Sequence, residues 1–241
     1  MFKHKGKTRT FSHNLQIASL LSLVAGIVNV VGFFSVQRLT TNVTGHFAFF
    51  VEEILQTNYL ESFVYFLFIF FFFLGSFVSS FIIEIVSKIN ERYIYIVPAF
   101  IEIIILLLLG IFGAFFQSIH PNIIAFSLLF SMGLQNSFVT TISNSVVRTT
   151  HLTGLFTDLG IEISQLFFYK EVEQNRKLKS SIKLRLVIIF SFFIGGILGG
   201  VLYVRFAMHT LLLAAFVLLI GMIYDSIKFQ LILLRRKIRN V

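Results

Sequence analysis

The chain has 241 residues, of which 56% are hydrophobic and only 13% charged, and its mean hydropathy is +0.89. This composition indicates an integral membrane protein and excludes an ordinary soluble domain. The absence of cysteine excludes a disulfide framework, a thiolate metal site and a cysteine nucleophile, and the net charge of +9 lies at the ends of apolar runs, which indicates orientation in a membrane and not nucleic-acid binding.

Six apolar runs are long enough to cross about 30 Å of hydrocarbon. Lys and Arg gather in the N-terminal tail, in the turn 88–92, in the loop 170–185 and near the C-terminus. Because positive charge is typical of cytoplasmic loops, we expect these four regions, and both termini, to lie in the cytoplasm. The predicted fold is an all-α, multi-pass protein of a bacterial cell membrane, with six transmembrane helices at 15–36, 62–86, 93–116, 122–147, 186–204 and 206–227.

Two polar segments of the chain are nearly the same. The segments 40–56 and 149–165 are identical at eight of seventeen aligned positions and share the pattern Thr-Thr-x-x-Thr-Gly-x-Phe. Both interrupt an otherwise apolar chain, so they predict a duplicated membrane protein with two equivalent polar elements. The Thr-Gly turn of each opens a short segment, 44–57 or 153–169, which we interpret as a half-helix that enters the membrane and returns. If both segments crossed instead, the chain would have eight crossings.

The duplication extends to the neighbouring helices. Gly26-x-x-Asn29 matches Gly133-x-x-Asn136 before the motifs, and a Phe-rich run with Gly75 or Gly195 follows them. Each copy has three crossings, an odd number, which predicts two repeats inverted in the membrane plane. The expected organisation is a basic tail at 1–14, repeats at 15–117 and 118–230, and a second basic tail at 231–241. Small residues around Gly195 favour close packing between the repeats, with a homodimer as the alternative.

The Thr-Gly turns are the predicted site. A turn of this kind places hydroxyls and free backbone N–H groups at the positive end of a helix, and glycine allows close approach. The same residues would be explained by simple helix capping and packing. The predicted solute-binding residues are Asn29, Asn42, Thr44, Gly45, Asn136, His151, Thr153 and Gly154.

Three carboxylates are candidates for coupling to protons or cations. Glu53 and Glu162 occupy equivalent positions on the half-helices, each with a Gln three residues later, and Glu102 lies within the third span. Carboxylates inside a membrane are costly and often functional. Solvated helix ends would explain the first two equally well.

These motifs resemble the YoaK-like family of bacterial inner-membrane proteins. The likeness rests on the two Gly-x-x-Asn helices, the Thr-Gly turns that follow them, and the Gly-x-x-x-Gly helix near Gly195, and it covers nearly the whole chain. The family usually has Asn at the position of His46 and often an acidic residue at that of Asn29. The resemblance implies a multi-pass inner-membrane protein and brings no established activity.

From these patterns we predict a transporter or channel-like carrier for a small polar solute, with an anion favoured over a bare cation. The alternative is a membrane scaffold or sensor in which the motifs only pack helices. An intramembrane enzyme is disfavoured, because the sequence offers no recognisable catalytic group. We expect no metal or cofactor and no nucleic acid; the expected partners are the lipid bilayer, a solute and, in the alternative above, a second copy of the chain.

Overall fold

The described part of the chain contains helices and no strands, so the all-α class is as predicted. In the computed structural model the backbone is described for residues 10–90 and 93–239, and the side chains as far as residue 225. The predicted tail at 1–14 therefore lies mostly outside the described residues, whereas the backbone of the predicted tail at 231–241 is helical to Arg239. The elements are α1 (Phe11–Val36), α2 (Thr44–Leu55), α3 (Tyr59–Ile89), α4 (Ile96–Ile119), α5 (Pro121–Ile142), α6 (Leu152–Phe168), α7 (Val172–Phe206), η3 (Ala207–His209) and α8 (Thr210–Arg239).

Five stretches of the described chain are long and apolar enough to cross a membrane. Four of them are α1, α3, α4 and α5, and the fifth is a 54-residue stretch, Val172–Asp225. The sequence predicted six, because it divided this last stretch in two. Ala207, with φ of 46°, marks the break between α7 and α8, and only the three residues of η3 separate them. Length and composition therefore give five stretches, which contain six long helices.

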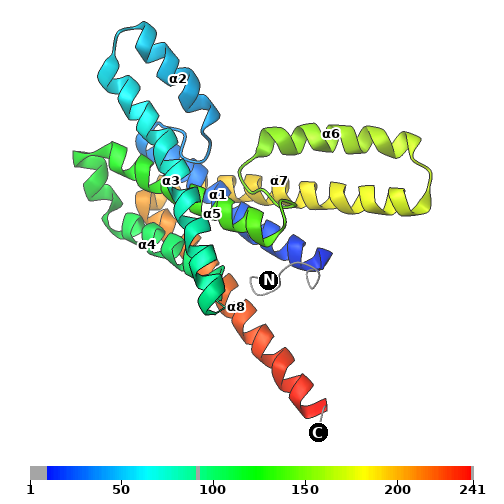
Figure 1. Cartoon of the computed structure of the whole chain (residues 1–241). Helices are drawn as coiled ribbons and strands as arrows, with labels where there is room; N and C mark the ends of the chain where they lie inside the picture. The colour runs from blue at the N-terminus through cyan, green and yellow to red at the C-terminus, as the bar shows by residue number, and fades with distance from the viewer. Residues whose placement is uncertain (1–9, 91–92, 240–241) are drawn as a thin grey trace.

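The long helices form a bundle whose directions follow from their contacts (Figure 1). The helices α1 and α5 are antiparallel, because Gln135 Nε2 donates to the Leu21 carbonyl oxygen at 3.1 Å while Gly32, further along α1, faces Leu128. The C-terminal ends of α1 and α4 lie together, where Gln117 Nε2 donates to a carbonyl oxygen of α1 at 2.7 Å. The helices α4 and α8 also pack together. Burial of Leu, Ile and Val side chains between these helices forms the main core.

Glycines bring α1 and α7 into backbone contact. A side chain at Gly26 would overlap the carbonyl oxygen of Phe192, and one at Gly195 would overlap that of Leu23. Close approach of this kind is the use that membrane helices make of small residues. The glycine-rich face of α7 therefore packs within the chain.

The same arrangement joins α3 and α5. A side chain at Gly75 would overlap the carbonyl oxygen of Phe130, and one at Gly133 would overlap that of Phe72. The Ser76 hydroxyl also donates to the Gly133 carbonyl oxygen at 3.1 Å. The two helix pairs thus use glycines at corresponding places in the sequence.

The short helices α2 and α6 each form a hairpin with the first part of the following long helix. Figure 1 shows the α2–α3 and α6–α7 hairpins extending from the bundle in different directions. With 12 and 17 residues, at 1.5 Å per residue, α2 and α6 are shorter than the hydrocarbon thickness. Phe49 of α2 stacks on Tyr65 of α3, with ring centroids 5.3 Å apart. The half-helices were thus predicted to within about two residues; whether they enter the membrane stays a prediction.

Candidate functional site

Each Thr-Thr pair is fastened to the helix that precedes it. The Thr41 hydroxyl donates to Asn29 Oδ1 at 2.6 Å, and Asn136 Nδ2 donates to the Thr150 hydroxyl at 2.7 Å. Both asparagines are half-buried. The two predicted asparagines therefore hold the turns in place.

The first threonine of each pair is fully buried. The Thr149 hydroxyl accepts a hydrogen bond from Gln135 Nε2 at 2.9 Å, and the Thr40 hydroxyl lies 3.5 Å from the Val28 carbonyl oxygen. Gln135, which was not a predicted site residue, also donates to the Leu21 carbonyl oxygen of α1 and so joins the second turn to the other half of the chain. Gln135 stands next to the predicted residue Asn136, and this position was the signal in the sequence from which its role could have been predicted.

The first turn is closed by a histidine. His46 is completely buried, and its Nε2 lies 2.6 Å from the Leu39 carbonyl oxygen. Since a carbonyl only accepts, Nε2 carries the proton and Nδ1, which has no hydrogen-bond partner among the described residues, is bare. Burial lowers the pKa of this ring, in keeping with the neutral form. The ring packs against Phe68 with centroids 4.9 Å apart, so the first turn is filled.

The predicted residues at the start of α2 are on the surface. Asn42 is exposed and its Oδ1 accepts from the Gly45 N–H at 3.3 Å, which caps the helix. Thr44, the first residue of α2, is exposed as well. A side chain at Gly45 would press on Leu39. In the first turn, therefore, Asn42 and Gly45 stabilise the start of α2 and do not line the pocket that lies at the second turn.

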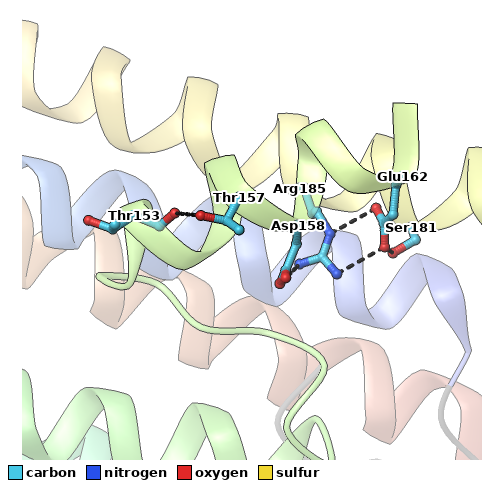
Figure 2. A network of polar contacts seen from close by, with 6 residues as sticks. All are labelled: Thr153, Thr157, Asp158, Glu162, Ser181 and Arg185. Atoms are coloured by element: carbon cyan, nitrogen blue, oxygen red, sulfur yellow. Dashed lines mark hydrogen bonds and ion pairs between the residues drawn. The ribbon is translucent and has the colours of Figure 1, made fainter. Parts of the chain in front are cut away.

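The second turn opens into a polar pocket of about 420 Å³. His151 immediately precedes α6, and Gly154 lies in the first turn of that helix. A side chain at Gly154 would overlap the His151 ring, so glycine is needed for the ring to lie there. Thr153 points elsewhere: it is exposed, and its carbonyl oxygen accepts from Thr157 at 3.0 Å (Figure 2). The pocket is lined by Ser145, Val146, Arg148, His151, Gly154, Leu155, Asp158, Ser181, Leu184 and Arg185.

Arg185 joins α7 to α6 beside this pocket (Figure 2). Its Nε and Nη2 donate to the two oxygens of Glu162 at 2.8 and 2.9 Å, and its Nη1 donates to Asp158 Oδ2 at 2.8 Å. The Ser181 hydroxyl donates to Glu162 Oε1 at 2.6 Å. Burial alone would raise the pKa of Glu162, but the hydrogen bonds from Arg185 and Ser181 outweigh it and lower that pKa. Glu162 is thus held as a carboxylate.

The other two predicted coupling carboxylates have different surroundings. Glu53 is half-buried near the end of α2 and accepts from Asn58 Nδ2 at 3.0 Å. Glu102 is completely buried on α4, and neither of its oxygens has a hydrogen-bond partner within the described part of the chain. None of the three carboxylates lines the pocket at the second turn, although Glu162 lies beside it through its hydrogen bonds to Arg185 and Ser181.

The two arginines that flank the turns differ. Arg38 donates to the Tyr65 hydroxyl and lies 3.6 Å from Glu61, so its charge is partly balanced. Arg148 lines the pocket and forms no ion pair with any residue of the described ranges. Both arginines stand next to a turn in the sequence, but the sequence does not indicate which of them faces a pocket.

Three residues of the network around Glu162 were not predicted as site residues: Asp158, Ser181 and Arg185. Asp158 and Glu162 stand four positions apart on a helix, which puts them on one face, and this was a readable signal for a shared cation. Nothing in the sequence identified Arg185, which lies 23 residues beyond Glu162. In the part of the chain that the structure describes, no group of three His, Asp or Glu is arranged to hold a metal ion.

Comparison with known proteins identifies a family and nothing closer. The model of the DUF1275 family, described as a protein of unknown function, matches residues 17–224. This confirms the resemblance to the YoaK-like proteins. No curated protein and no solved structure matches the chain.

Proposed function

We propose that this chain, which belongs to the DUF1275 family of polytopic membrane proteins of unknown function, is a carrier. The proposed solute is small and bears a carboxylate. The observation that carries this proposal is the polar pocket at the second Thr-Gly turn. A scaffold needs its polar turns packed, whereas a carrier needs one of them accessible. The proposal is of a transporter and not of an enzyme.

The charges of the pocket favour an anion. Arg185 is balanced by Asp158 and Glu162, which leaves Arg148 as the cation without a described counter-charge. The pocket also includes Gly154 in the first turn of α6, where helix N–H groups carry partial positive charge. A carboxylate entering this pocket would meet both. The volume suits a solute of a few carbon atoms and its water.

The two turns differ in a way that fits a carrier open on one side. His46 fills the first turn, whereas the second turn reaches the pocket through His151 and Gly154. A carrier that exposes its site to one side at a time requires one closed and one open end. By the distribution of Lys and Arg, the open end is the cytoplasmic one.

We further propose that the two halves are inverted repeats. Support comes from matched contacts: Gly26 meets Phe192 as Gly133 meets Phe72, and the Asn-to-Thr hydrogen bond recurs in both halves. The positions of the Phe49–Tyr65 ring pair correspond to those of Asp158–Arg185. Each of the two helix pairs, α1 with α7 and α3 with α5, thus takes one long helix from each half.

The helix directions favour six crossings over eight. If α2 and α6 also crossed, α1 and α5 would run in the same direction. They run antiparallel, as the contacts of Gln135 with Leu21 and of Gly32 with Leu128 require. Six crossings also put both termini on one side, which the basic residues assign to the cytoplasm.

A membrane scaffold is the second candidate. What favours it is that Asn29 and Asn136, the best-placed polar side chains of the predicted site, already bond to Thr41 and Thr150. In this alternative the turns serve packing, and the pocket holds only water.

The proposal is tested by uptake into proteoliposomes. The purified full-length protein is reconstituted, and uptake of radiolabelled acetate, lactate and succinate is measured against protein-free liposomes, with choline as a cationic comparison. We expect uptake of at least one carboxylate and none of choline. The variant Arg148→Gln should reduce that uptake about tenfold or more, the loss expected for a hydrogen bond to a charged group.

The matched control is Lys177→Gln, because Lys177 is exposed on α7 and, within the described ranges, its ion pair is with Glu173. Its uptake should equal that of the unmodified chain. Uptake that is absent for every carboxylate, or unchanged in Arg148→Gln, would refute the carrier proposal and favour the scaffold.

A further inference from the structure

A basic pocket lies at the start of α7. Its volume is about 600 Å³, and it is formed between the first residue of α1, Phe11, and the first three turns of α7. No carboxylate lines it, and none of its four basic residues forms an ion pair with a described residue. The basic residues are Lys170, Arg176, Lys179 and Lys183.

An apolar groove continues from this pocket along α7. Its volume is about 380 Å³, and Lys179 and Lys183 line both the groove and the basic pocket. Beyond the two lysines the groove is lined almost entirely by hydrocarbon, including the exposed side chains of Phe190 and Ile194. The remaining lining residues are Leu166, Ile182, Leu186, Val187 and Ser191.

The two cavities share one face of α7. Their lining positions from Val172 to Ile194 recur every three or four residues, which is the spacing of a single helical face. The uncharged part of α7 up to the Arg205 turn is about 20 residues long, or roughly 30 Å, the thickness of the hydrocarbon layer. Lys183 therefore lies at the level of the lipid headgroups, and the groove lies among the acyl chains.

We propose that this face of α7 binds an anionic phospholipid, with its phosphate between Lys179 and Lys183 and an acyl chain in the groove. Charge complementarity identifies the occupant: four cations without a carboxylate call for a phosphate, and an apolar groove that begins at two of those cations calls for a chain attached to it. A zwitterionic lipid would meet the same groove but gain less from the lysines. The inference is independent of any transport activity.

Native mass spectrometry of the full-length protein in detergent tests this. Phosphatidylglycerol and phosphatidylcholine with identical acyl chains are added in equal amounts, and bound lipid is counted. We expect preferential binding of phosphatidylglycerol. The variant Lys179→Gln with Lys183→Gln should lose about fivefold per lysine and with it most of the preference, and the Arg pair at the same positions should keep it.

Control variants separate the headgroup from the chain. Phe190→Gln with Ile194→Gln should weaken binding of both lipids, whereas Phe193→Gln with Ile197→Gln, on a neighbouring exposed face, should not. Lys177→Gln should also leave the preference unchanged. Equal binding of the two lipids, or a preference that survives loss of both lysines, would overturn the proposal. Competition by glycerol phosphate at the same concentration would do so too, because it would indicate a site for a free phosphate.

Discussion

Replacing Arg185 by Met removes the connection between α6 and α7 with little change in side-chain volume. The guanidinium makes three charge-assisted hydrogen bonds to Glu162 and Asp158, all between 2.8 and 2.9 Å. The side chains of Arg185 and Glu162 are only 21% and 14% exposed. The substitution therefore leaves Glu162 as a mostly buried carboxylate with only Ser181 as a donor.

The cost follows from burial. Removing one partner of a fully buried ion pair costs about 3–5 kcal/mol, and an exposed pair contributes less than about 1 kcal/mol. Because this pair is partly accessible, we expect Arg185→Met to lower the free energy of unfolding by about 2 kcal/mol near neutral pH. Asp158, whose side chain is 51% exposed, is worth less, and Asp158→Asn should cost below about 1 kcal/mol.

The loss should depend on pH in a defined direction. The pKa of Glu162 is lowered in the folded chain relative to its ordinary value of 4.5, so its contribution to stability is present above that value. As the pH falls through the lowered folded-state pKa, the carboxylate is protonated and the contribution is lost. The difference between Arg185→Met and the unmodified chain should therefore shrink in acid.

The measurement is unfolding of the purified protein by SDS in mixed micelles, followed by circular dichroism at several pH values. Lys177→Met is the matched control, because Lys177 and Glu173 form an ion pair with both side chains more than 70% exposed. Its effect should be below about 0.5 kcal/mol. If Arg185→Met costs no more than this control, the reasoning from burial is wrong.

Three further predictions concern packing, the turns and the topology. Gly133→Ala should sharply reduce the folded fraction recovered from membranes, because its methyl group would overlap the α3 backbone, whereas Gly160→Ala, with nothing within 4 Å of an added Cβ, should raise stability by about 0.5–1 kcal/mol. In a double-mutant cycle, Asn136→Ala and Thr150→Ala should show a coupling energy of about 0.6–2 kcal/mol; additive effects would mean that their 2.7 Å hydrogen bond contributes nothing. A single Cys at Ser118, in a chain without cysteine, should react with an impermeant thiol reagent from outside the cell, and cytoplasmic labelling would favour eight crossings.

The elements could be predicted closely because their signal is local. An apolar run long enough to cross a membrane, bounded by polar residues, identifies a helix, and the repeated Thr-Gly motif located α2 and α6. The count of five apolar stretches differs from the predicted six because η3 is too short to separate α7 from α8 by composition. That difference concerns where a stretch is divided and leaves the helices unchanged.

The candidate site was predictable only in part because side-chain direction depends on the register of a turn. Thr44 and Thr153 carry the motif but are exposed, while Thr40 and Thr149, a few residues earlier, are buried. A shift of one or two residues in the turn decides which threonine hydroxyl points inward. The amino-acid composition of the segment does not reveal that shift. Long-range partners such as Arg185 are fixed by packing, which a single sequence does not specify.

The contrast between the hairpins has a consequence for how the protein is made. At corresponding positions, the α2–α3 hairpin has the uncharged Phe49–Tyr65 ring pair and the α6–α7 hairpin has the Asp158–Arg185 ion pair. In the proposed topology the first hairpin must be carried through the bilayer during synthesis, and the second remains on the ribosome side. Charges are costly to move through hydrocarbon, whereas aromatic rings are not. At these two positions the chemistry of each pair thus suits the route of insertion of its hairpin, and we expect that exchanging the two pairs would impair biogenesis before it affected the finished fold.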